Sequence, residues 1–341
     1  MPRMKKINWI NLSVCLTLLS RSFTAKLWRE VPAMRPRDLG ALLLLAALWG
    51  GSFLFIRLAA PALGPLALMD LRVLLAGGAL LVYAAIARRL PAWRSWWRRY
   101  LILGALNAAA PFTLIATAEL RLTASLAAIL NATTPLFTAL VAAVWLKERV
   151  TAPKAAGLAL GVVGVAVLVG WSPLPPSGAV LLSVGASLLA ALFYGLGGVY
   201  AKVAFGGVPP LALTIGQQMG ASVCLLLFAA LTLPAIRPAP GVLAAVVALA
   251  LLCTSLGYLL YFHLIRSVGP TKTLSVTFLV PVFGLLWSTL FLREPVGAGT
   301  VAGLAIILAS VTLVTGIRVF PGRRAGAPPV PGAGARPGKA R

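Results

Sequence analysis

Long blocks of apolar residues, separated by short polar joints, fill most of the chain. Ten blocks have roughly the length, about 18–25 residues, that crosses a bilayer as a helix. They occupy residues 39–56, 66–87, 100–118, 122–146, 155–172, 178–200, 210–233, 242–265, 273–292 and 298–317. Glycine and proline mark the joints, as at residues 61–65, 173–177 and 208–210. Because lipid offers no partner to a free peptide group, each block is predicted to be helical.

The second half of the sequence repeats the first at an offset of 145 or 146 residues. The matched pairs include Gly50 with Gly195, Arg57 with Lys202, Pro135 with Pro281 and Glu148 with Glu294. Each copy holds five predicted helices, an odd number, so the second copy must enter the membrane upside down. The sequence therefore predicts an all-α polytopic membrane protein with ten transmembrane helices in two inverted five-helix repeats, at residues 38–172 and 173–318.

Lys and Arg are distributed unevenly between the joints. They concentrate at residues 88–99, 147–154 and 266–272 and in the C-terminal tail. The alternate joints together hold only four arginines, Arg57, Arg121, Arg237 and Arg293. Because positive residues accumulate on the cytoplasmic side, both termini are expected in the cytoplasm of a bacterial-type cell, with the chain in its inner membrane.

Composition excludes several other classes of protein. The 30 Lys and Arg against 6 Asp and Glu give a formal charge of +24, which elsewhere suggests a nucleic-acid partner. Here only 11% of residues are charged and 60% are hydrophobic, and the positive residues lie in joints and tails. No Walker loop, RNA-recognition motif or zinc-finger spacing is present. We therefore expect no nucleic acid, cofactor or metal, the last because His263 is the single histidine and the cysteines have no ligand-like spacing.

The two ends of the chain differ from its body. Residues 1–37 form an N-terminal extension, in which Arg3, Lys5 and Lys6 precede an apolar stretch too short to span. Because Met34 lies directly before the first strong block, this extension is expected to be a mis-called start or dispensable. Residues 319–341, rich in Pro, Gly, Ala and Arg, are expected to form a disordered basic tail.

Short motifs in both copies resemble the drug/metabolite transporter superfamily, specifically EamA-type permeases with two tandem EamA units. The motifs are Leu48-Trp49-Gly50, Asp70-Leu71-Arg72, Pro135-Leu136-Phe137, Leu146-Lys147-Glu148-Arg149, Gly257-Tyr258, Pro281-Val282-Phe283 and Leu292-Arg293-Glu294. One departure is Arg293, where the family more often has glycine. The resemblance covers about residues 39–317. It implies a permease or exporter of small metabolites, amino-acid-like solutes or drugs that works by alternating access, and it does not name the substrate.

Arg72 is the charged residue that lies deepest in a predicted span, about 9 Å from the outer end at about 1.5 Å per residue. Such a charge either faces a wet cavity or a partner, or reaches back to the headgroups, and the sequence leaves both readings open. Asp70 lies on another face of the helix and is expected in the interface. Gln217 takes the place of Arg72 in the second copy, and both are candidate substrate-binding residues.

The fourth and ninth blocks carry matching stripes of small or polar residues. The stripes are Ala127, Asn131, Pro135, Thr138 and Ala142, and Thr273, Thr277, Pro281, Gly284 and Ser288. Helix packing and cavity lining both select such residues, so each stripe is expected to serve both. Asn131, Thr138 and Thr277 are the candidate lining residues, and the prolines are expected to kink the helices. Gly157, Gly161 and Gly164 are predicted to form a packing face.

Aromatic and acidic residues complete the set of candidates. Trp49, Tyr194, Tyr258, Tyr261 and Trp287 lie within spans, and Trp49 and Tyr258 are candidate lining residues. Trp93, Trp96 and Trp97 are expected to anchor an arginine-rich interfacial loop, and His263 is expected at the interface. Glu119 is expected to be an exposed loop carboxylate, with a coupling proton as the alternative. Glu148 and Glu294 are predicted to cap or pair at helix joints.

A channel or scaffold and an intramembrane enzyme are the competing functions. The enzyme is disfavoured because no GxSxG, HExxH or pair of mid-membrane aspartates is present. Two opposed repeats exceed what a simple pore requires, so the inverted repeat favours a carrier. Because no ATP-binding motif is present, transport is expected to use an ion gradient or the gradient of the solute itself.

Overall fold

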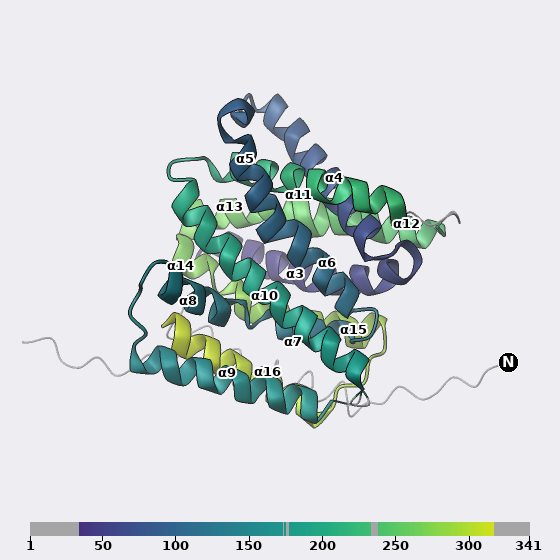
Figure 1. The fold of residues 1–341 in the computed structure, drawn as a ribbon, viewed down its shortest axis with the longest axis vertical. Coiled ribbons are helices and arrows are strands. Elements are labelled where there is room, and N and C mark those ends of the chain that lie inside the picture. Colours follow the sequence, from purple (N-terminus) through teal and green to yellow (C-terminus); the bar gives the residue numbers. More distant parts are fainter. Residues whose placement is uncertain (1–33, 173, 175–176, 233–237, 317–341) are drawn as a thin grey trace, which may run out of the picture.

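The computed structural model describes residues 34–172, 174, 177–232 and 238–316. The described residues form helices joined by short turns, with no strand among them (Figure 1). The first half contains α3 (Pro36–Leu63), α4 (Pro65–Ile86), α5 (Trp93–Gly104), the π-helix η1 (Ala105–Ala109), α6 (Ala110–Ala118), α7 (Ala124–Asn131), α8 (Thr134–Trp145) and α9 (Ala152–Gly170). The second half contains α10 (Gly178–Ala204), α11 (Pro210–Thr232), α12 (Pro240–Val247), the π-helix η2 (Ala248–Leu256), α13 (Gly257–Val268), α14 (Pro270–Thr273), α15 (Val276–Phe291) and α16 (Ala298–Thr315).

Nine helical stretches in the described part of the chain are long and apolar enough to cross a membrane. Three are joined from shorter pieces: Trp93–Ala118, Ala124–Trp145 and Pro240–Val268. The all-helical prediction is confirmed. The ninth predicted block corresponds to α14 and α15, and α15 has only 16 residues because the helix is interrupted at residues 274–275. The predicted N-terminal extension up to residue 33, Arg237 and the basic tail lie outside the described residues.

Two predicted boundaries were wrong. Helix α3 continues to Leu63, so Arg57 lies within a helix and not in a joint; Gly64, whose φ of 76° suits glycine, ends it. Helix α5 begins at Trp93, so most of the expected loop at residues 88–99 is helical. A hydropathy scan misses this start because arginines alternate with the tryptophans. Trp96 nevertheless packs inward, stacked on Phe205 with ring centroids 5.5 Å apart.

One helix contact occurs twice, once in each half. A Cβ atom added to Gly50 in α3 would lie 2.7 Å from the backbone nitrogen of Gly284 in α15. A Cβ atom added to Gly195 in α10 would lie 2.9 Å from the backbone nitrogen of Thr138 in α8. These four residues are two of the matched pairs of the sequence repeat. The first helix of each half therefore packs closely against the fourth helical stretch of the other half.

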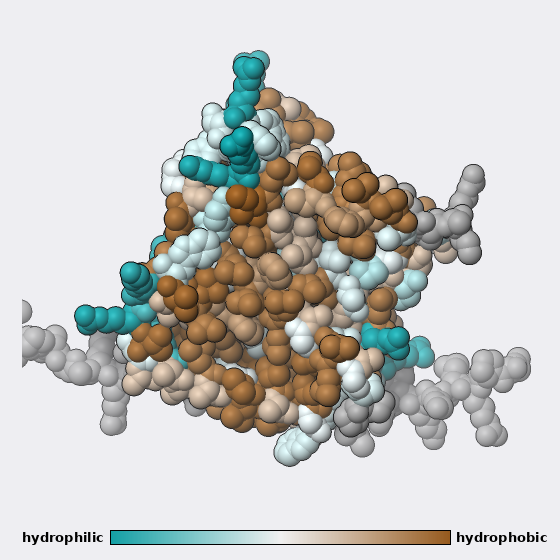
Figure 2. Space-filling view, viewed as in Figure 1, coloured by the Kyte–Doolittle hydropathy of each residue, from teal (hydrophilic) through white to brown (hydrophobic). Residues whose placement is uncertain are grey.

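Helices α9 and α16 lie side by side along one edge of the protein (Figure 1). Three buried glycines of α9 allow the close approach, since a Cβ at Gly157 or Gly164 would lie 2.6 Å from Val314 or 2.8 Å from Ile307. The predicted packing face is confirmed. Apolar side chains cover much of the face in Figure 2, with hydrophilic groups gathered at its margins, as expected for a protein that meets lipid.

Each half also carries a π-helical segment in its third helical stretch. At the repeat offset of 146, η1 coincides with residues 251–255 of η2. In η2 the hydroxyls of Thr254 and Ser255 donate to carbonyls five residues earlier, at 2.8 and 3.1 Å. Such wide turns are common at functional sites because they redirect side chains without ending the helix. Here the two segments supply Asn107 and Thr254 to the cluster described next.

Candidate functional site

Arg72 faces the interior of the helix bundle. Only 7% of the residue is exposed, and its Nε donates a hydrogen bond of 3.0 Å to the Thr254 hydroxyl in η2. Its guanidinium carbon lies 3.8 Å from the ring centre of Phe112 in α6. Of the two readings that the sequence left open, the inward one fits these contacts, because a side chain that reaches for headgroups would not pack on an interior ring.

No ion pair in the described part of the chain includes Arg72. The pairs there join Glu148 to two lysines and Asp38 to His263. Asp70, expected in the interface, is also buried, at 5% exposed, and its Oδ1 accepts a hydrogen bond of 2.7 Å from the Ser222 hydroxyl. A guanidinium keeps its proton at any working pH, so Arg72 is a buried positive charge without a carboxylate partner among the described residues.

Two amides and a phenol form a chain beside Arg72. Asn107 Nδ2 donates to Gln217 Oε1 at 2.8 Å, and Gln217 Nε2 donates to the Tyr258 hydroxyl oxygen at 3.2 Å. The chain thus links η1, α11 and α13. Tyr258 and Tyr194 both lie close enough to interact electrostatically with the Arg72 charge. Gln217 and Arg72, equivalent in the two copies, therefore contribute to one cluster.

Trp49 of α3 adds an aromatic wall to this cluster. Its ring centroid lies 6.1 Å from that of Tyr258 and 5.5 Å from that of Tyr261. Gly257 makes room for it, since a Cβ there would lie 2.7 Å from the indole nitrogen. The structure thus brings together four of the predicted site residues, Arg72, Gln217, Tyr258 and Trp49. Charged, amide and aromatic groups from both halves meet at this place.

The other three predicted site residues occupy different places. The Oδ1 atom of Asn131, at the end of α7, is buried without a hydrogen-bond partner among the described residues. Thr138 packs against Gly195, and its hydroxyl donates to the Thr134 carbonyl at 2.9 Å. The hydroxyl of Thr277 donates to the Leu274 carbonyl at 2.8 Å. Each hydroxyl thus bonds to the backbone three or four residues before it, and neither bonds to the cluster around Arg72.

Sequence reasoning missed Asn107, Phe112 and Thr254, which complete the cluster. Asn107 and Thr254 lie near the centres of predicted apolar blocks, so a search for polar residues far from block ends would have found them. Phe112 has no such signal, because a phenylalanine in an apolar block is ordinary core. Its role becomes visible only through the Arg72 guanidinium above its ring.

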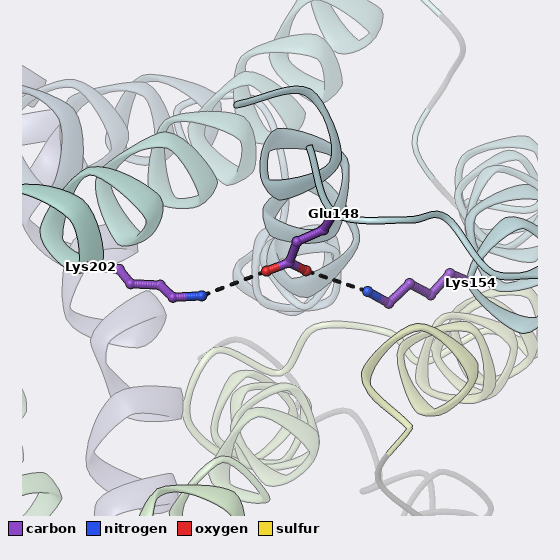
Figure 3. A network of polar contacts seen from close by, with 3 residues as sticks. All are labelled: Glu148, Lys154 and Lys202. Atoms are coloured by element: carbon purple, nitrogen blue, oxygen red, sulfur yellow. Dashed lines mark ion pairs between the residues drawn. The ribbon is translucent and has the colours of Figure 1, made fainter. Parts of the chain in front are cut away.

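Glu294 and Glu148, equivalent in the repeat, make different contacts. Glu294 caps α7: its carboxylate accepts hydrogen bonds from the backbone nitrogens of Ala124 (2.8 Å) and Ser125 (3.1 Å) and from the Ser125 hydroxyl (2.8 Å). Glu148 instead lies between Lys154 and Lys202, each 3.6 Å away (Figure 3). One glutamate caps and the other pairs, so the prediction for both is confirmed.

The residues before these glutamates explain a departure from the family pattern. Lys147 and Arg293 both adopt the left-handed region, with φ of 54° and 55°. In each case the following glutamate N–H bonds to the carbonyl six residues earlier, in Ala142 or Ser288. A left-handed residue commonly follows the last turn of a helix, and glycine occupies that position without strain. The glycine that the family more often has there therefore suits the turn.

Glu119 contradicts the expectation of an exposed loop carboxylate. It follows α6 directly and is 0% exposed. Its backbone carbonyl accepts a hydrogen bond from the Arg57 guanidinium of α3. The prediction was wrong because hydropathy locates the end of a block but not the direction in which the chain then turns.

Comparisons with known proteins agree with this architecture. The EamA-like transporter family matches residues 39–170 and 181–316, so two EamA units cover most of the chain. The transporter YvbV of Bacillus subtilis is 30% identical over 82% of this chain and 92% of its own length. The inner membrane transporter YedA of Escherichia coli is 30% identical over 85% and 94%. Protein PecM of Dickeya dadantii is 27% identical over 81% and 91%.

A solved crystal structure has the same fold. It superposes with a TM-score of 0.58 and 20% sequence identity over 83% of this chain and 97% of its own. At that identity the likeness concerns the arrangement of the helices alone. It extends over both halves of the chain.

Proposed function

The chain belongs to the EamA-like transporter family, and from this premise we propose that it is a secondary transporter of small solutes in the inner membrane of a bacterial-type cell. It does so with ten membrane helices in two inverted repeats that alternate access to a central site. The names of the relatives support transport, and that of YedA supports the inner membrane. The doubled contact of α3 with α15 and of α10 with α8 supports the inverted pairing.

The proposed substrate class is amino-acid-like solutes with an anionic group. One observation carries this choice: Arg72 is a buried positive charge with no ion-pair partner in the described residues. A carboxylate of the solute matches the planar guanidinium fork and compensates the cost of burying it. Gln217 and Tyr258 offer neutral polar groups nearby, and the ring of Trp49 suits an ammonium group or an apolar side chain.

Unequal closure of the two ends supports alternating access. At the α7 end, residues 124–130 are all buried. Their repeat counterparts at the other end, residues 270–276, include Pro270 and Leu274, which are exposed. An alternating carrier in one state is closed at one end and open at the other, so equivalent segments of its two repeats differ in burial, as these two segments do. In this proposal Asn131, Thr138 and Thr277 belong to the path walls.

The test is counterflow in proteoliposomes with a mixture of radiolabelled amino acids as probe. A carrier gives uptake that saturates and is accelerated by unlabelled amino acids trapped inside. Arg72→Lys keeps the charge but loses the fork, so transport should fall about tenfold or more, and Arg72→Ala should abolish it. Arg98→Lys and Arg98→Ala, at an exposed arginine, are the matched controls and should transport normally.

Near-normal flux in Arg72→Lys, with an unchanged half-saturating concentration, would remove Arg72 from the site. Uptake that neither saturates nor shows counterflow would favour a channel. All four variants must reach the membrane in equal amounts, which quantitative immunoblotting of membrane fractions checks.

A further inference from the structure

Glu119 is the most completely buried carboxyl group of the described residues. It is 0% exposed, and neither carboxyl oxygen has a hydrogen-bond donor there. The other two buried carboxylates of the described residues have partners: Asp70 accepts a hydrogen bond from Ser222, and Asp38 lies 3.5 Å from His263. The partly buried Glu294 accepts three hydrogen bonds at the start of α7. An ionised carboxylate without donors or water is among the costliest groups to bury.

The charges that face Glu119 come from three elements. Arg57 of α3 and Arg72 of α4 are positive, and Glu294 of the turn between α15 and α16 is negative. The Arg57 guanidinium donates its hydrogen bond to the backbone carbonyl of Glu119 and not to the carboxyl group. None of the ion pairs in the described residues includes Glu119. The neighbouring η1 and α7 contain no ionisable residue. In α10, the ring of Tyr194 lies against Phe112, and Lys202 pairs with Glu148 at the opposite end of the protein.

This environment favours the neutral acid. Burial, reinforced by the Glu294 charge, raises the pKa of the Glu119 carboxyl well above its ordinary value, and Arg57 and Arg72 oppose it more weakly. The Glu294 carboxylate accepts hydrogen bonds from three donors at the start of α7 and makes no hydrogen bond to the Glu119 carboxyl group. Glu119 therefore holds a proton while the α7 end is closed.

We propose that Glu119 is a proton-binding site that is loaded when the α7 end of the protein closes and emptied when that end opens. The inference rests on the alternating access of the proposed function. On closing, the carboxylate takes one proton from water and becomes the neutral acid, and on opening it returns that proton. Because the group is shut off from solvent in the closed state, the proton leaves by the end through which it came. The site sets how readily this end opens and carries no net proton across.

The first experiment tests whether the proton is there. Infrared spectra of the full-length protein in lipid at neutral pH should show the C=O stretch of an un-ionised carboxylic acid. Glu119→Gln should remove this band, and Glu119→Asp should shift it. Glu148→Gln changes an exposed, ion-paired glutamate and should leave the band unchanged. Asp70→Asn identifies any part of the band that comes from Asp70, which is also buried. A band that is absent, or that keeps full intensity in Glu119→Gln, overturns the proposal.

The second experiment tests the coupling to closure. Ala124→Cys places a thiol at a fully buried position of the α7 end, which a hydrophilic maleimide reaches only after opening. The labelling rate is measured in nanodiscs for two proteins, one with Ala124→Cys alone and one with Ala124→Cys and Glu119→Gln together. The rate of the chain without Ala124→Cys is subtracted from both. Dividing the rate of the protein that keeps Glu119 by the rate of the Glu119→Gln protein cancels the pH dependence of the thiol. This ratio should be near one in acid and rise, by at most about tenfold per pH unit, as Glu119 loses its proton.

The outcomes separate this inference from the proposed function. Labelling with a ratio that stays constant with pH overturns the proton site and leaves alternating access standing. No labelling at any pH in either chain overturns the opening itself, and the proposed function with it. Ala118→Cys, at the buried end of α6, repeats the measurement at a second position in case Ala124→Cys fails to fold.

Discussion

Single residues in this protein meet the cost of buried charge in three ways. The partly buried carboxylate of Glu294 accepts three hydrogen bonds at a helix start. Arg72 has no ion-pair partner among the described residues, and in the proposed function an anionic group of the solute supplies one. Glu119, without donors, is neutral in the closed state. Each solution follows from the number of donors or opposite charges within reach, since the interior supplies little else.

The close contact at Gly50 gives a prediction at this scale. Gly50→Ala forces a methyl against the backbone of α15, at 2.7 Å from the Gly284 nitrogen, and should destabilise the protein by about 1–3 kcal/mol. Gly40→Ala, in the same helix with nothing within 4 Å, should be neutral or slightly stabilising. Thermal unfolding of the purified variants in detergent measures both. Equal midpoints for the two variants would show that α3 and α15 have room to separate.

The sequence reveals some of these residues and hides others for a physical reason. Arg72 was recognisable because a charge in an apolar block is rare, and Gln217 because the repeat aligns it with Arg72. Glu119 was misread because its burial depends on the turn into α7 and on Arg57, far away in the sequence. The contact of Arg72 with Thr254 joins residues 182 positions apart, which no local pattern encodes.

At the scale of elements, two equivalent prolines act differently. Pro135 follows the break between α7 and α8; it has no N–H for the Asn131 carbonyl, which accepts the Thr134 hydroxyl at 2.7 Å instead. Pro281 lies inside the continuous helix α15, and the break in that stretch comes earlier, at residues 274–275. A kink was predicted at both prolines, and proline alone did not determine where the helix is interrupted.

Capping at the helix joints gives the prediction at this scale. Glu294→Ala removes three charge-assisted hydrogen bonds from the start of α7 and should destabilise the protein by about 2 kcal/mol. Glu148→Ala, its repeat equivalent, removes only an exposed ion pair and should cost about 1 kcal/mol or less. Thermal unfolding in parallel, with Lys154→Ala as a further surface control, measures the difference. A larger loss in Glu148→Ala would reverse the assignment of the closed end.

At the scale of the whole molecule, the two halves are interleaved. The first helix of each half packs against the fourth stretch of the other, and α9 of the first half packs against α16 of the second. The candidate site is built the same way, with Arg72 and Trp49 from one half and Gln217 and Tyr258 from the other. The repeat in the sequence predicted two equivalent halves, but it did not predict which helices would pack against one another.

Topology gives the prediction at this scale. A fluorescent reporter that matures only in the cytoplasm should be active when inserted at residues 89–92, before α5, or at the exposed Gly206 and Gly207. At residues 172–177 it should be dark, and a periplasmic phosphatase should be active there instead, because the basic residues lie on the other side. The opposite pattern at any of the three sites would overturn the ten-helix orientation.

The interleaved contacts also govern how the protein is made. When the ribosome has completed α9, the small-residue faces of α3 and α8 have no partner, since Gly284 and Gly195 have not yet been synthesised. The first half must therefore wait in the bilayer, loosely assembled, until α10 and then α15 arrive. Each half completes the folding of the other, and assembly becomes stable only late in synthesis.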